Sequence, residues 1–423
     1  MIAFIMAGGK GTRISSIASD IPKPMIRVCG KPVLEYQIDC LRKQGIMDFI
    51  LAIGHLGDVV RGYFGDGSRW GVKISYYQEE QPLGTAGAVA AMKKDLQGDF
   101  LLLNGDLIFD VDVARMLAFH RDNHALITLA AHPNSHPYDS ALLVTNQDGC
   151  VVQWLSKDEP RALYKNRVNA GVQILSAKVF APFTEVKKLD LDKDIIRPLL
   201  STGGVYAYDT TEYIKDMGTP ERYDRVCQDM ETGVVRRKNL SQKQRTVFLD
   251  RDGVINVHKG FLKRSADMEL LPGSAEAIRR INDSGYLALV VTNQPVIARG
   301  DCTWEELDEI HRAMETLLGS EGAYVDGIFI CPHHTDRGFP GEVAEYKIDC
   351  ECRKPKPGLL LRAAQQYNVD LAQSYMVGDS DSDIQAGIAA GCRTAFIGSN
   401  QGRTGTACYS SLLEFSEAVL AAE

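Results

Sequence analysis

Short apolar runs alternate with helical patterns from the start of the chain. Runs of strand length lie at 2–6, 49–53, 100–103 and 125–131. This alternation predicts an α/β sheet domain. From 141 to 209 strand-like runs dominate, at 141–145, 151–154, 171–175 and 205–208, with one helix expected near 192–200. The added strands are expected to wall one side of a pocket.

The pattern breaks at 236–245, where the sequence RRKNLSQKQR is polar and basic with no apolar period. Such a segment favours a solvated linker over a binding patch. The βα rhythm then restarts, with strand-like runs at 246–249, 287–291, 327–330, 375–377 and 394–397. A helix over 303–318 opens with a capping box at Thr303 and Glu306. Five βα units predict a second domain with a doubly wound parallel sheet.

Length and charge narrow the class of protein. At 423 residues the chain exceeds the about 250–300 residues at which single cores stop growing. We therefore expect two domains, 1–235 and 246–423, joined by the linker 236–245. The net charge of −8 offers no general attraction for nucleic acid or an anionic membrane. Because no run approaches the about 18 apolar residues of a membrane span and no basic leader precedes the first strand, we expect a cytoplasmic protein.

A glycine-rich turn follows the first predicted strand. The sequences AGGKGTR at 7–13 and PKPM at 22–25 combine glycines with Arg13 and Lys23. Glycines let backbone N–H groups approach a triphosphate, and the two cations can neutralise charge as pyrophosphate leaves. Tight βα turns need glycine in any case, so this turn alone is weak evidence. Gln78 and the loop PLGTAG at 82–87 are suited to reading a base edge and a ribose.

Two aspartates are candidate metal ligands in the same domain. Asp106 follows the strand at 100–103 in the sequence NGD, and Asp216 lies far downstream in KDMGTPE. A hard cation that bridges phosphates takes carboxylate oxygens. Both aspartates are therefore candidate Mg²⁺ ligands.

The motifs GGKGTR, PKPM, LGTAG, NGD, NAG and DMGTPE, in this order, resemble the sugar-1-phosphate nucleotidyltransferase family. The resemblance implies a Rossmann-like mixed sheet of the GT-A type. It also implies direct attack of a sugar phosphate oxygen on the α-phosphorus of a nucleoside triphosphate, with Arg13 and Lys23 at the reacting phosphates. The residues it assigns to the nucleotide are Gly8, Gly9, Gly11, Thr12, Gln78 and Gly84.

The resemblance also assigns Asn169 and Gly171 to the sugar. Ser156-Lys157 stands where the family has a Glu-Lys pair, so one expected sugar contact is missing and Lys157 is a candidate for the sugar phosphate. The opening AGGKGTRI, IPKPM and GKPVLEY is most similar to the guanylyltransferases of heptose 1-phosphate. That similarity favours GTP as the nucleotide.

The second domain begins with an Asp-x-Asp turn after the run at 246–249. Asp250 can attack phosphorus, and Asp252 can protonate the leaving oxygen and then activate water. A lone turn of this kind is more often a solvated or metal-binding loop. Three further strand ends change that balance. Thr292 and Asn293 can hold a phosphoryl oxygen, Lys354 can offset negative charge, and GDSDSD at 378–383 offers carboxylates for Mg²⁺.

These four motifs, in this order, resemble the haloacid dehalogenase (HAD) superfamily. DRDGVIN, TNQ, ARG, CPHH, CECRKPKPG and GDSDSD are similar to its histidinol-phosphate and heptose-bisphosphate phosphatase group. Aspartate rather than threonine at 252 favours hydrolysis, and the short interval to Thr292 leaves no room for a large cap domain. The resemblance assigns Mg²⁺ to Asp250, Asp252 and Asp379. It assigns substrate phosphate to Thr292, Asn293, Arg299, Arg353 and Lys354.

A cysteine and histidine cluster lies before the catalytic lysine. Cys331, His333, Cys350 and Cys352 offer three sulfurs and one imidazole, which suit a closed, structural Zn²⁺ site. His334 competes with His333 as the fourth ligand. Because Cys352 is followed by Arg353 and Lys354, an ordered metal loop would also fix the lysine.

The two resemblances describe consecutive steps. A phosphatase that removes the 7-phosphate of D-glycero-D-manno-heptose 1,7-bisphosphate makes the 1-phosphate that the other half would convert with GTP into GDP-heptose and pyrophosphate. One alternative is a hexose-1-phosphate nucleotidyltransferase fused to a histidinol-phosphate-like phosphatase. Another is a sensor of nucleotide sugars without turnover. The sequence leaves self-association open.

Overall fold

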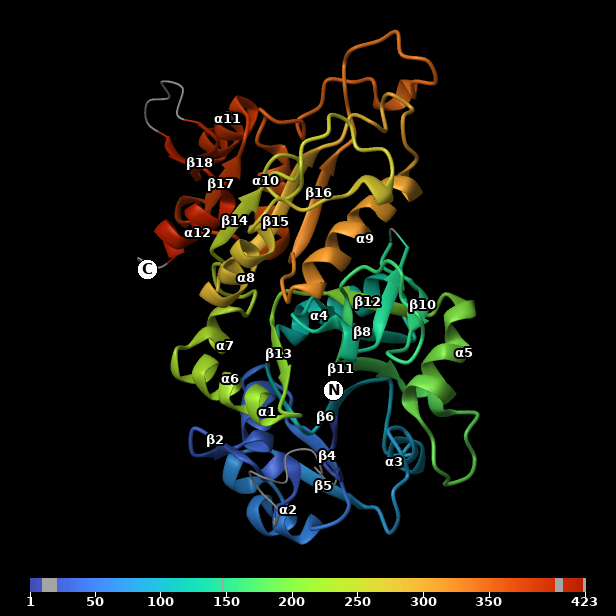
Figure 1. Ribbon diagram of the computed structural model, residues 1–423. Helices are drawn as coiled ribbons and strands as arrows, with labels where there is room; N and C mark the ends of the chain where they lie inside the picture. The colour runs from blue at the N-terminus through green and yellow to red at the C-terminus, as the bar shows by residue number, and fades with distance from the viewer. Residues whose placement is uncertain (10–20, 147, 400–405, 421–423) are drawn as a thin grey trace. The chain divides into compact units, whose positions relative to one another are not determined.

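The N-terminal half contains a mixed sheet (Figure 1). The first strand lies inside this sheet. The structure, a computed structural model, describes residues 1–9, 21–146, 148–399 and 406–420. β1 (Ile2–Met6) pairs in parallel with β4 (Asp48–Ile53) and β6 (Asp99–Asn104), and β4 pairs in parallel with β5 (Lys73–Gln78). β11 (Val168–Ser176) runs antiparallel to β6. The predicted α/β domain with a mixed sheet is confirmed.

Further strands extend the sheet beyond β11. They are β8 (Ile127–His132), β9 (Leu142–Thr145), β10 (Val151–Leu155) and β12 (Val205–Asp209). The strands expected between 125 and 208 are therefore present, with ends shifted by a few residues. The helix expected near 192–200 consists of a π-helix over Leu191–Ile196, α5 (Arg197–Leu199) and a 3-10 turn over Leu200–Thr202.

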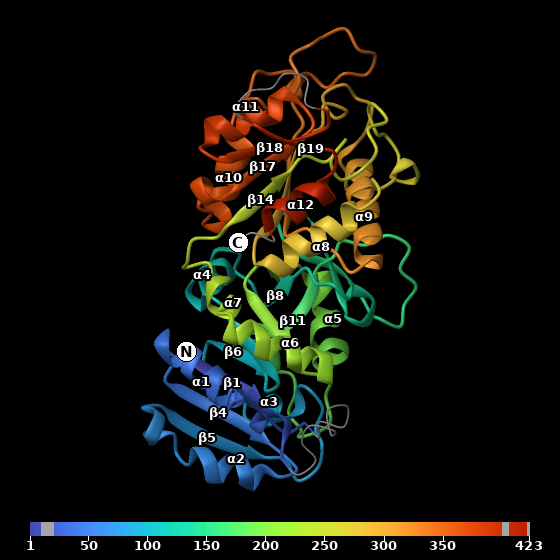
Figure 2. The ribbon, with the colours of Figure 1, turned by 60° about the vertical axis from the view of Figure 1, so that its left-hand side comes forward.

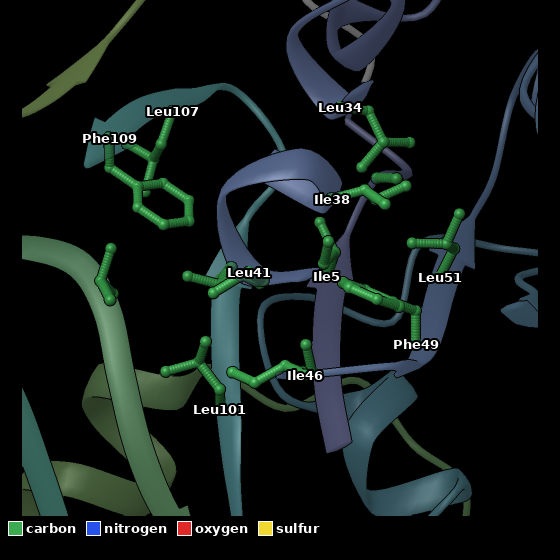
Figure 3. Packing of buried hydrophobic residues seen from close by; sticks show 14 of the residues in the cluster. Ile5, Leu34, Ile38, Leu41, Ile46, Phe49, Leu51, Leu101, Leu107 and Phe109 are labelled. Atoms are coloured by element: carbon green, nitrogen blue, oxygen red, sulfur yellow. The ribbon is translucent and has the colours of Figure 1, made fainter. Parts of the chain in front are cut away.

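Helix α1 (Val33–Lys43) packs on the parallel strands through one apolar face. Leu34, Ile38 and Leu41 recur at helical spacing and are fully buried. Figure 3 shows these side chains gathered with Ile5 and Phe49 of the strands. Full burial of a side chain of this size contributes about 1.5–3 kcal/mol. The other helices of this half are α2 (Gly57–Phe64), α3 (Gly87–Ala91), α4 (Val113–Asp122), α6 (Pro220–Glu231) and α7 (Val234–Arg237).

A separate two-stranded antiparallel sheet joins β7 (Leu107–Asp110) to β13 (Tyr213–Asp216). Its register places Asp216 opposite Leu107, the residue after Asp106. Two predicted metal ligands that lie far apart in the sequence are thereby brought to neighbouring positions. A second small sheet pairs β2 (Arg27–Val28) with β3 (Lys31–Pro32).

The C-terminal half forms a parallel sheet of order β16-β15-β14-β17-β18-β19. The strands are β14 (Thr246–Leu249), β15 (Leu287–Asn293), β16 (Gly327–Cys331), β17 (Tyr375–Gly378), β18 (Arg393–Ile397) and β19 (Ala407–Tyr409). The doubly wound parallel sheet is confirmed, and β19 extends it beyond the five expected units.

Helices cover both faces of this sheet. Figure 2 shows α8 (Ser274–Ser284) and α12 (Leu412–Leu420) together over one face. Val247 and Leu249 of β14 pack into the apolar cluster that these helices share with α9 (Trp304–Ser320), whereas Phe248 packs into the cluster with α10 (Gly358–Tyr367) and α11 (Asp381–Ala390). Alternate residues of a strand point to opposite faces of the sheet, so β14 is apolar on both of its faces. The capping box predicted for α9 is present at Thr303 and Glu306.

The chain forms two units, and the last boundary along the chain falls between Asn239 and Leu240. The first unit holds Met1–His132, Leu143–Leu155 and Asn169–Asn239, and the second holds Leu240–Glu423 with Pro133–Leu142 and Ser156–Val168. The boundary lies inside the predicted linker, but that segment is not solvated throughout. Leu240 is buried in an apolar cluster of the second unit, and the Gln244 N–H donates to the Asn368 carbonyl oxygen at 3.0 Å. The domain limits at 235 and 246 stay a prediction.

Candidate active sites

Two glycines at the carboxyl end of β1 open the first candidate site. A side chain at Gly8 would lie 2.5 Å from the Glu79 carboxylate and 3.2 Å from the Gly54 nitrogen, so it would displace Glu79 and crowd the backbone at Gly54. Gly9 has open space around its Cα, which suits the approach of a ligand. Gly11, Thr12 and Arg13 lie outside the described residues, so their assignment to the triphosphate stays a prediction.

Lys23 and Asp106 form an ion pair at this edge of the sheet. The Asp106 carbonyl oxygen accepts from the Met217 N–H at 3.2 Å, which ties the NGD turn to the end of β13. Asp216 pairs with Arg222 of α6 at 2.9 Å. Burial by itself would raise the pKa of Asp216, but the Arg222 charge and hydrogen bonds outweigh it and lower that pKa. The structure thus brings Lys23 and both predicted Mg²⁺ ligands to one place, and adds Arg222.

The second glycine loop is held against a later segment of the same unit. Gly84 has φ of +77°, and a side chain there would meet the Leu189 carbonyl oxygen. The same oxygen accepts from the Ala86 N–H at 3.0 Å, and Thr85 Oγ1 accepts from the Leu191 N–H at 2.7 Å. Gln78, at the end of β5, donates to the Gly54 carbonyl oxygen at 3.2 Å. The predicted nucleotide residues Gly8 and Gln78 therefore share a neighbour in Gly54.

We expect Gly84→Ala to weaken the N-terminal unit. The new methyl group meets a backbone oxygen, and a non-glycine residue at positive φ adds strain, for a combined cost of about 2 kcal/mol in the free energy of unfolding. Chemical denaturation checks the change. Gly203→Ala is the matched control, because Gly203 also has a positive φ of 71° but open space around it. A cost at Gly84 no greater than at Gly203 would contradict the close approach.

The predicted sugar residues lie on β11 beside the end of β6. Val172 pairs with Leu103 in the antiparallel register, so Gly171 faces the position of Asn104. The Gly171 N–H donates to Asn169 Oδ1 at 3.3 Å. Lys157 is exposed and belongs to the segment Ser156–Val168, which groups with the second unit. Its assignment to the sugar phosphate stays a prediction.

Lys354 links the ends of several strands in the second candidate site. Its Nζ lies 2.8 Å from Asp250 Oδ1 and 2.6 Å from Asp383 Oδ1, and donates to the Val291 carbonyl oxygen at 2.8 Å. The residue is only 3% exposed. Burial would lower the pKa of Lys354, but the two carboxylates outweigh it and raise that pKa. The lysine is therefore a fixed buried cation beside Asp250.

Asp250, Asp379 and Asp383 offer ligand atoms that all lie within 4.8 Å of one another. Burial raises the pKa of Asp250 to about 6, with Lys354 opposing the rise and Asp383 adding to it. Burial also raises the pKa of Asp379, and Asp383 again adds to the rise. Carboxylates gathered this closely are stabilised by a cation among them, and oxygen donors suit Mg²⁺.

The Asp252 carboxylate lies among donors rather than in this cluster of acids. It accepts from Arg251 Nη2 at 2.8 and 3.0 Å, from Asn256 Nδ2 at 2.9 Å and from Gln294 Nε2 at 3.0 Å. Burial by itself would raise the pKa of Asp252, but the Arg251 charge and the amide hydrogen bonds outweigh it and lower that pKa. Its predicted role as a Mg²⁺ ligand stays a prediction.

Thr292 and Asn293 lie at the end of β15, as predicted. Asn293 and Lys354 exchange hydrogen bonds, since Asn293 Nδ2 donates to the Lys354 carbonyl oxygen and the Lys354 N–H donates to Asn293 Oδ1, both at 3.1 Å. Thr292 is buried, and its Oγ1 accepts from Gln294 at 2.8 Å. These contacts fix Asn293 and the lysine relative to each other.

The predicted phosphate-binding arginines lie on loops. The Arg299 guanidinium lies 4.0 Å from the Phe339 ring centroid and 4.4 Å from that of Phe261, and its Nε donates to Asp301 at 2.9 Å. Arg353 Nη1 donates to the His333 carbonyl oxygen at 3.0 Å. Arg299 thus contacts two aromatic rings as well as Asp301, and these contacts restrict its guanidinium.

Four side chains gather at the end of β16 and in the loop before Lys354. Cys352 Sγ lies 3.3 Å from Cys331 Sγ, from Cys350 Sγ and from His333 Nδ1, and Cys331 Sγ lies 3.6 Å from Cys350 Sγ and from His333 Nδ1. The competing ligand His334 is not in this group, and its Nδ1 accepts from the Asp336 N–H. Of the two histidines, the structure therefore places His333 in the cluster.

No helix of the described ranges 1–9, 21–146, 148–399 and 406–420 is long and apolar enough to cross a membrane. A family model described as nucleotidyl transferase matches residues 2–233, and one described as HAD-hydrolase-like matches residues 351–410. These matches fall on the two halves that carry the two candidate sites.

Among characterised relatives, D-glycero-beta-D-manno-heptose-1,7-bisphosphate 7-phosphatase of Yersinia pestis is 42% identical over 158 residues, 37% of this chain and 82% of that protein. Mannose-1-phosphate guanylyltransferase of Mycobacterium tuberculosis is 32% identical over 235 residues, 55% of this chain and 65% of that protein. The solved structure of HddC from Yersinia pseudotuberculosis complexed with GMP-PN is 27% identical, with a TM-score of 0.48, and the match covers 54% of this chain and 99% of that one.

Proposed function

The chain belongs to the nucleotidyl transferase family through residues 2–233 and to the family of the heptose-bisphosphate phosphatases through its C-terminal part, and we therefore propose that it carries out two consecutive steps of nucleotide-heptose synthesis. The first step hydrolyses the 7-phosphate of D-glycero-D-manno-heptose 1,7-bisphosphate. The second transfers GMP from GTP to the resulting 1-phosphate, which gives GDP-heptose and pyrophosphate. The observation that carries the proposal is that one chain joins a relative of heptose-1,7-bisphosphate 7-phosphatases, whose product is a sugar 1-phosphate, to a nucleotidyl transferase region similar to an enzyme that takes a sugar 1-phosphate.

In the hydrolytic site, an Asp250 oxygen forms a bond to phosphorus as the bond between phosphorus and the sugar oxygen breaks. Asp252 in its protonated form gives its proton to that oxygen. It then takes a proton from the water whose oxygen bonds to phosphorus as the bond between phosphorus and Asp250 breaks, which releases inorganic phosphate and restores Asp250. Lys354 holds Asp250 and offsets the charge of the phosphoryl group. When bound, Mg²⁺ supplies further charge neutralisation, and Asp250, Asp379 and Asp383 would hold it.

In the nucleotidyltransferase site, an oxygen of the sugar phosphate attacks the α-phosphorus of GTP and the bond to the pyrophosphate oxygen breaks. No covalent enzyme intermediate forms, so the protein contributes alignment and charge. Lys23, with Arg13 from the glycine turn, offsets the charge that develops on pyrophosphate. Asp106 and Asp216 would hold Mg²⁺, which supplies charge neutralisation at the phosphates.

The substrate assignment is tested by an assay of the purified full chain with Mg²⁺. Heptose 1,7-bisphosphate and heptose 1-phosphate, each as the α and the β anomer, histidinol phosphate and mannose 1-phosphate are each combined with GTP, ATP, UTP or dTTP. Phosphate and pyrophosphate are measured separately. The proposal predicts the highest phosphate release with a heptose bisphosphate and the highest pyrophosphate release with heptose 1-phosphate and GTP. Higher activity with mannose 1-phosphate would favour the hexose alternative, and no turnover would favour a sensor.

The cluster of Cys331, His333, Cys350 and Cys352 fits a zinc ion. Ligand atoms about 2.3 Å from a tetrahedral zinc lie roughly 3.8 Å apart, close to the 3.3 to 3.6 Å separations found here. Four protein ligands leave no open position, so the role we propose is structural. Arg353 bonds to the His333 backbone, and Lys354 follows it, so the metal loop supports the catalytic lysine.

Cys352→Ser is expected to lose about one equivalent of zinc per chain and to lower the unfolding temperature of the second unit. Phosphate release falls because the loop that places Lys354 loosens, whereas pyrophosphate release is retained. Metal analysis and the two product assays measure this. Cys392→Ser, a cysteine of the same unit outside the cluster, is the control. Equal zinc content in the two variants would argue against the site.

A further inference from the structure

Gln294 is a buried amide beside the second site to which the proposed chemistry assigns no role. It follows β15 directly and is 2% exposed. Its Nε2 donates to Asp252 Oδ2 at 3.0 Å and to Thr292 Oγ1 at 2.8 Å, and its Oε1 accepts from Arg251 Nη2 at 3.2 Å. One side chain therefore connects the end of β15 to both residues that follow Asp250.

Arg251 holds the Asp252 carboxylate from the other direction. The residue is fully buried, its Nη2 contacts both carboxylate oxygens, and its Nη1 lies 3.2 Å from His311 Nε2 on α9. A guanidinium can only donate, so His311 Nε2 accepts and the imidazole is neutral with its proton on Nδ1. Burial, with the Arg251 charge adding to it, lowers the pKa of His311 to about 3, in agreement with a neutral ring.

This arrangement fixes the plane of one carboxyl group. A carboxyl group has a broad, roughly two-fold torsional preference, so packing alone leaves its orientation loose. Here Asn256 donates to Oδ1, Gln294 donates to Oδ2, and Arg251 contacts both oxygens. A buried cation without a partner would be costly, so Arg251 cannot release Asp252 without finding another anion. The network permits little rotation of the Asp252 side chain.

We propose that Gln294 is a positioning residue that, with the Arg251 and His311 pair, holds Asp252 in the orientation from which it transfers a proton to the leaving alcohol oxygen. The inference rests on the general-acid role of Asp252 in the proposed function. In that step the Asp252 O–H bond breaks as the bond between phosphorus and oxygen breaks, and the proton goes to the alcohol. The carboxylate left behind is the species that accepts the four hydrogen bonds seen here.

Two substrates with different leaving groups distinguish a loss of Asp252 positioning from general damage to the fold. A sugar alcohol needs a proton as it departs, whereas nitrophenolate from p-nitrophenyl phosphate departs without one. General acid catalysis contributes about 10²- to 10⁴-fold. For Gln294→Met we therefore expect kcat on the sugar bisphosphate to fall about 30- to 100-fold, with KM within about twofold of wild type and kcat on p-nitrophenyl phosphate lowered less than about threefold.

Gln294→Glu is the second variant, because it keeps the shape and the acceptor for Arg251 but replaces the donor to Asp252 by an oxygen. We expect the same discrimination between the two substrates. Gln244→Met is the matched control, since Gln244 is a glutamine of the same unit that is 3% exposed and does not contact Asp252 among its described bonds. The activity on p-nitrophenyl phosphate, which depends on the same unit, reports whether each variant folds.

The variant Asp252→Asn distinguishes the general-acid role of Asp252 from the positioning role of Gln294. If Asp252→Asn spares p-nitrophenyl phosphate but Gln294→Met and Gln294→Glu lose both substrates equally, or neither, the positioning role is wrong while the general-acid role holds. If Asp252→Asn itself shows no discrimination, the general-acid role in the proposed function is wrong. Discrimination by Asp252→Asn and by both Gln294 variants is the result the proposal requires.

Discussion

Replacing Asp250 by asparagine should lower phosphate release from the sugar bisphosphate by about 10⁴-fold or more, about 5.4 kcal/mol of lost transition-state stabilisation. The amide keeps the size of the side chain but is a poor nucleophile towards phosphorus. It also removes one of the two carboxylates that flank the buried Lys354. Steady-state assays of phosphate release measure the loss, and pyrophosphate release from heptose 1-phosphate and GTP should stay within about twofold of wild type.

Asp349→Asn is the control for Asp250→Asn, because Asp349 is an exposed aspartate of the same unit that pairs only with the half-buried Lys356 among its described contacts. It should leave both activities near wild type. Retention of more than about a tenth of the phosphatase activity in Asp250→Asn would show that another group attacks phosphorus.

Asp106→Asn should have the opposite effect on the two activities, with nucleotidyl transfer lost and phosphatase activity retained. Asp106 pairs with Lys23 and lies beside the end of β13 that carries Asp216. Loss of its charge removes a predicted Mg²⁺ ligand and frees Lys23 from its partner, so nucleotidyl transfer should fall about 10³-fold, about 4 kcal/mol. Pyrophosphate release measures this change. Phosphate release from the bisphosphate should be unaffected, because Asp106 belongs to the other unit.

Asp110→Asn is the matched control for Asp106→Asn. Asp110 ends β7, only four residues on, and its Oδ1 accepts from Asn239 Nδ2 at 2.7 Å. Burial raises the pKa of Asp110. Asp110 is not among the residues predicted to bind Mg²⁺ or phosphate. A fall in pyrophosphate release as large in Asp110→Asn as in Asp106→Asn would indicate damage to the fold rather than to metal binding.

Many of the strands and helices could be predicted because the local pattern of apolar and turn residues indicates them. β1 and β14 are apolar runs bounded by turn residues, and their limits in the structure match the sequence prediction. The place of Asp250 could be anticipated because ligands gather at the carboxyl ends of parallel strands. Lys354, predicted at a strand end, lies instead in the loop before α10 and reaches Asp250 from there. β19 could not, because three residues, Ala407–Tyr409, are too short to show a period.

The partners of the predicted residues were harder to find in the sequence. The Asp-x-Asp motif gives no role to its middle residue, Arg251. In the structure Arg251 is the fully buried cation that forms an ion pair with Asp252. Gln294 and His311 lie on different elements, and only the packing of α9 on the sheet brings them to Arg251. Buried polar groups need partners, but a sequence does not say which distant residue supplies them.

Asp383 and Arg222 did leave a usable signal. Asp383 follows Asp379 by four residues across the start of α11, a spacing that returns the side chain to the same side. Arg222 lies in the first turn of α6, capped by Thr219, shortly after Asp216. In both cases the helix start converts a short interval in sequence into a contact, so motif searches should extend into the first turn of the following helix.

Phosphorus NMR of one reaction tests the central claim that this chain performs both steps. Wild-type protein is mixed with D-glycero-D-manno-heptose 1,7-bisphosphate, GTP and Mg²⁺, and the spectrum is followed with time. We expect inorganic phosphate to replace the 7-phosphate signal first. The signals of a nucleoside diphosphate sugar and of pyrophosphate should then rise together in equal amounts. Loss of the 7-phosphate without any nucleotide sugar, or formation of nucleotide sugar that retains the 7-phosphate, would contradict this claim.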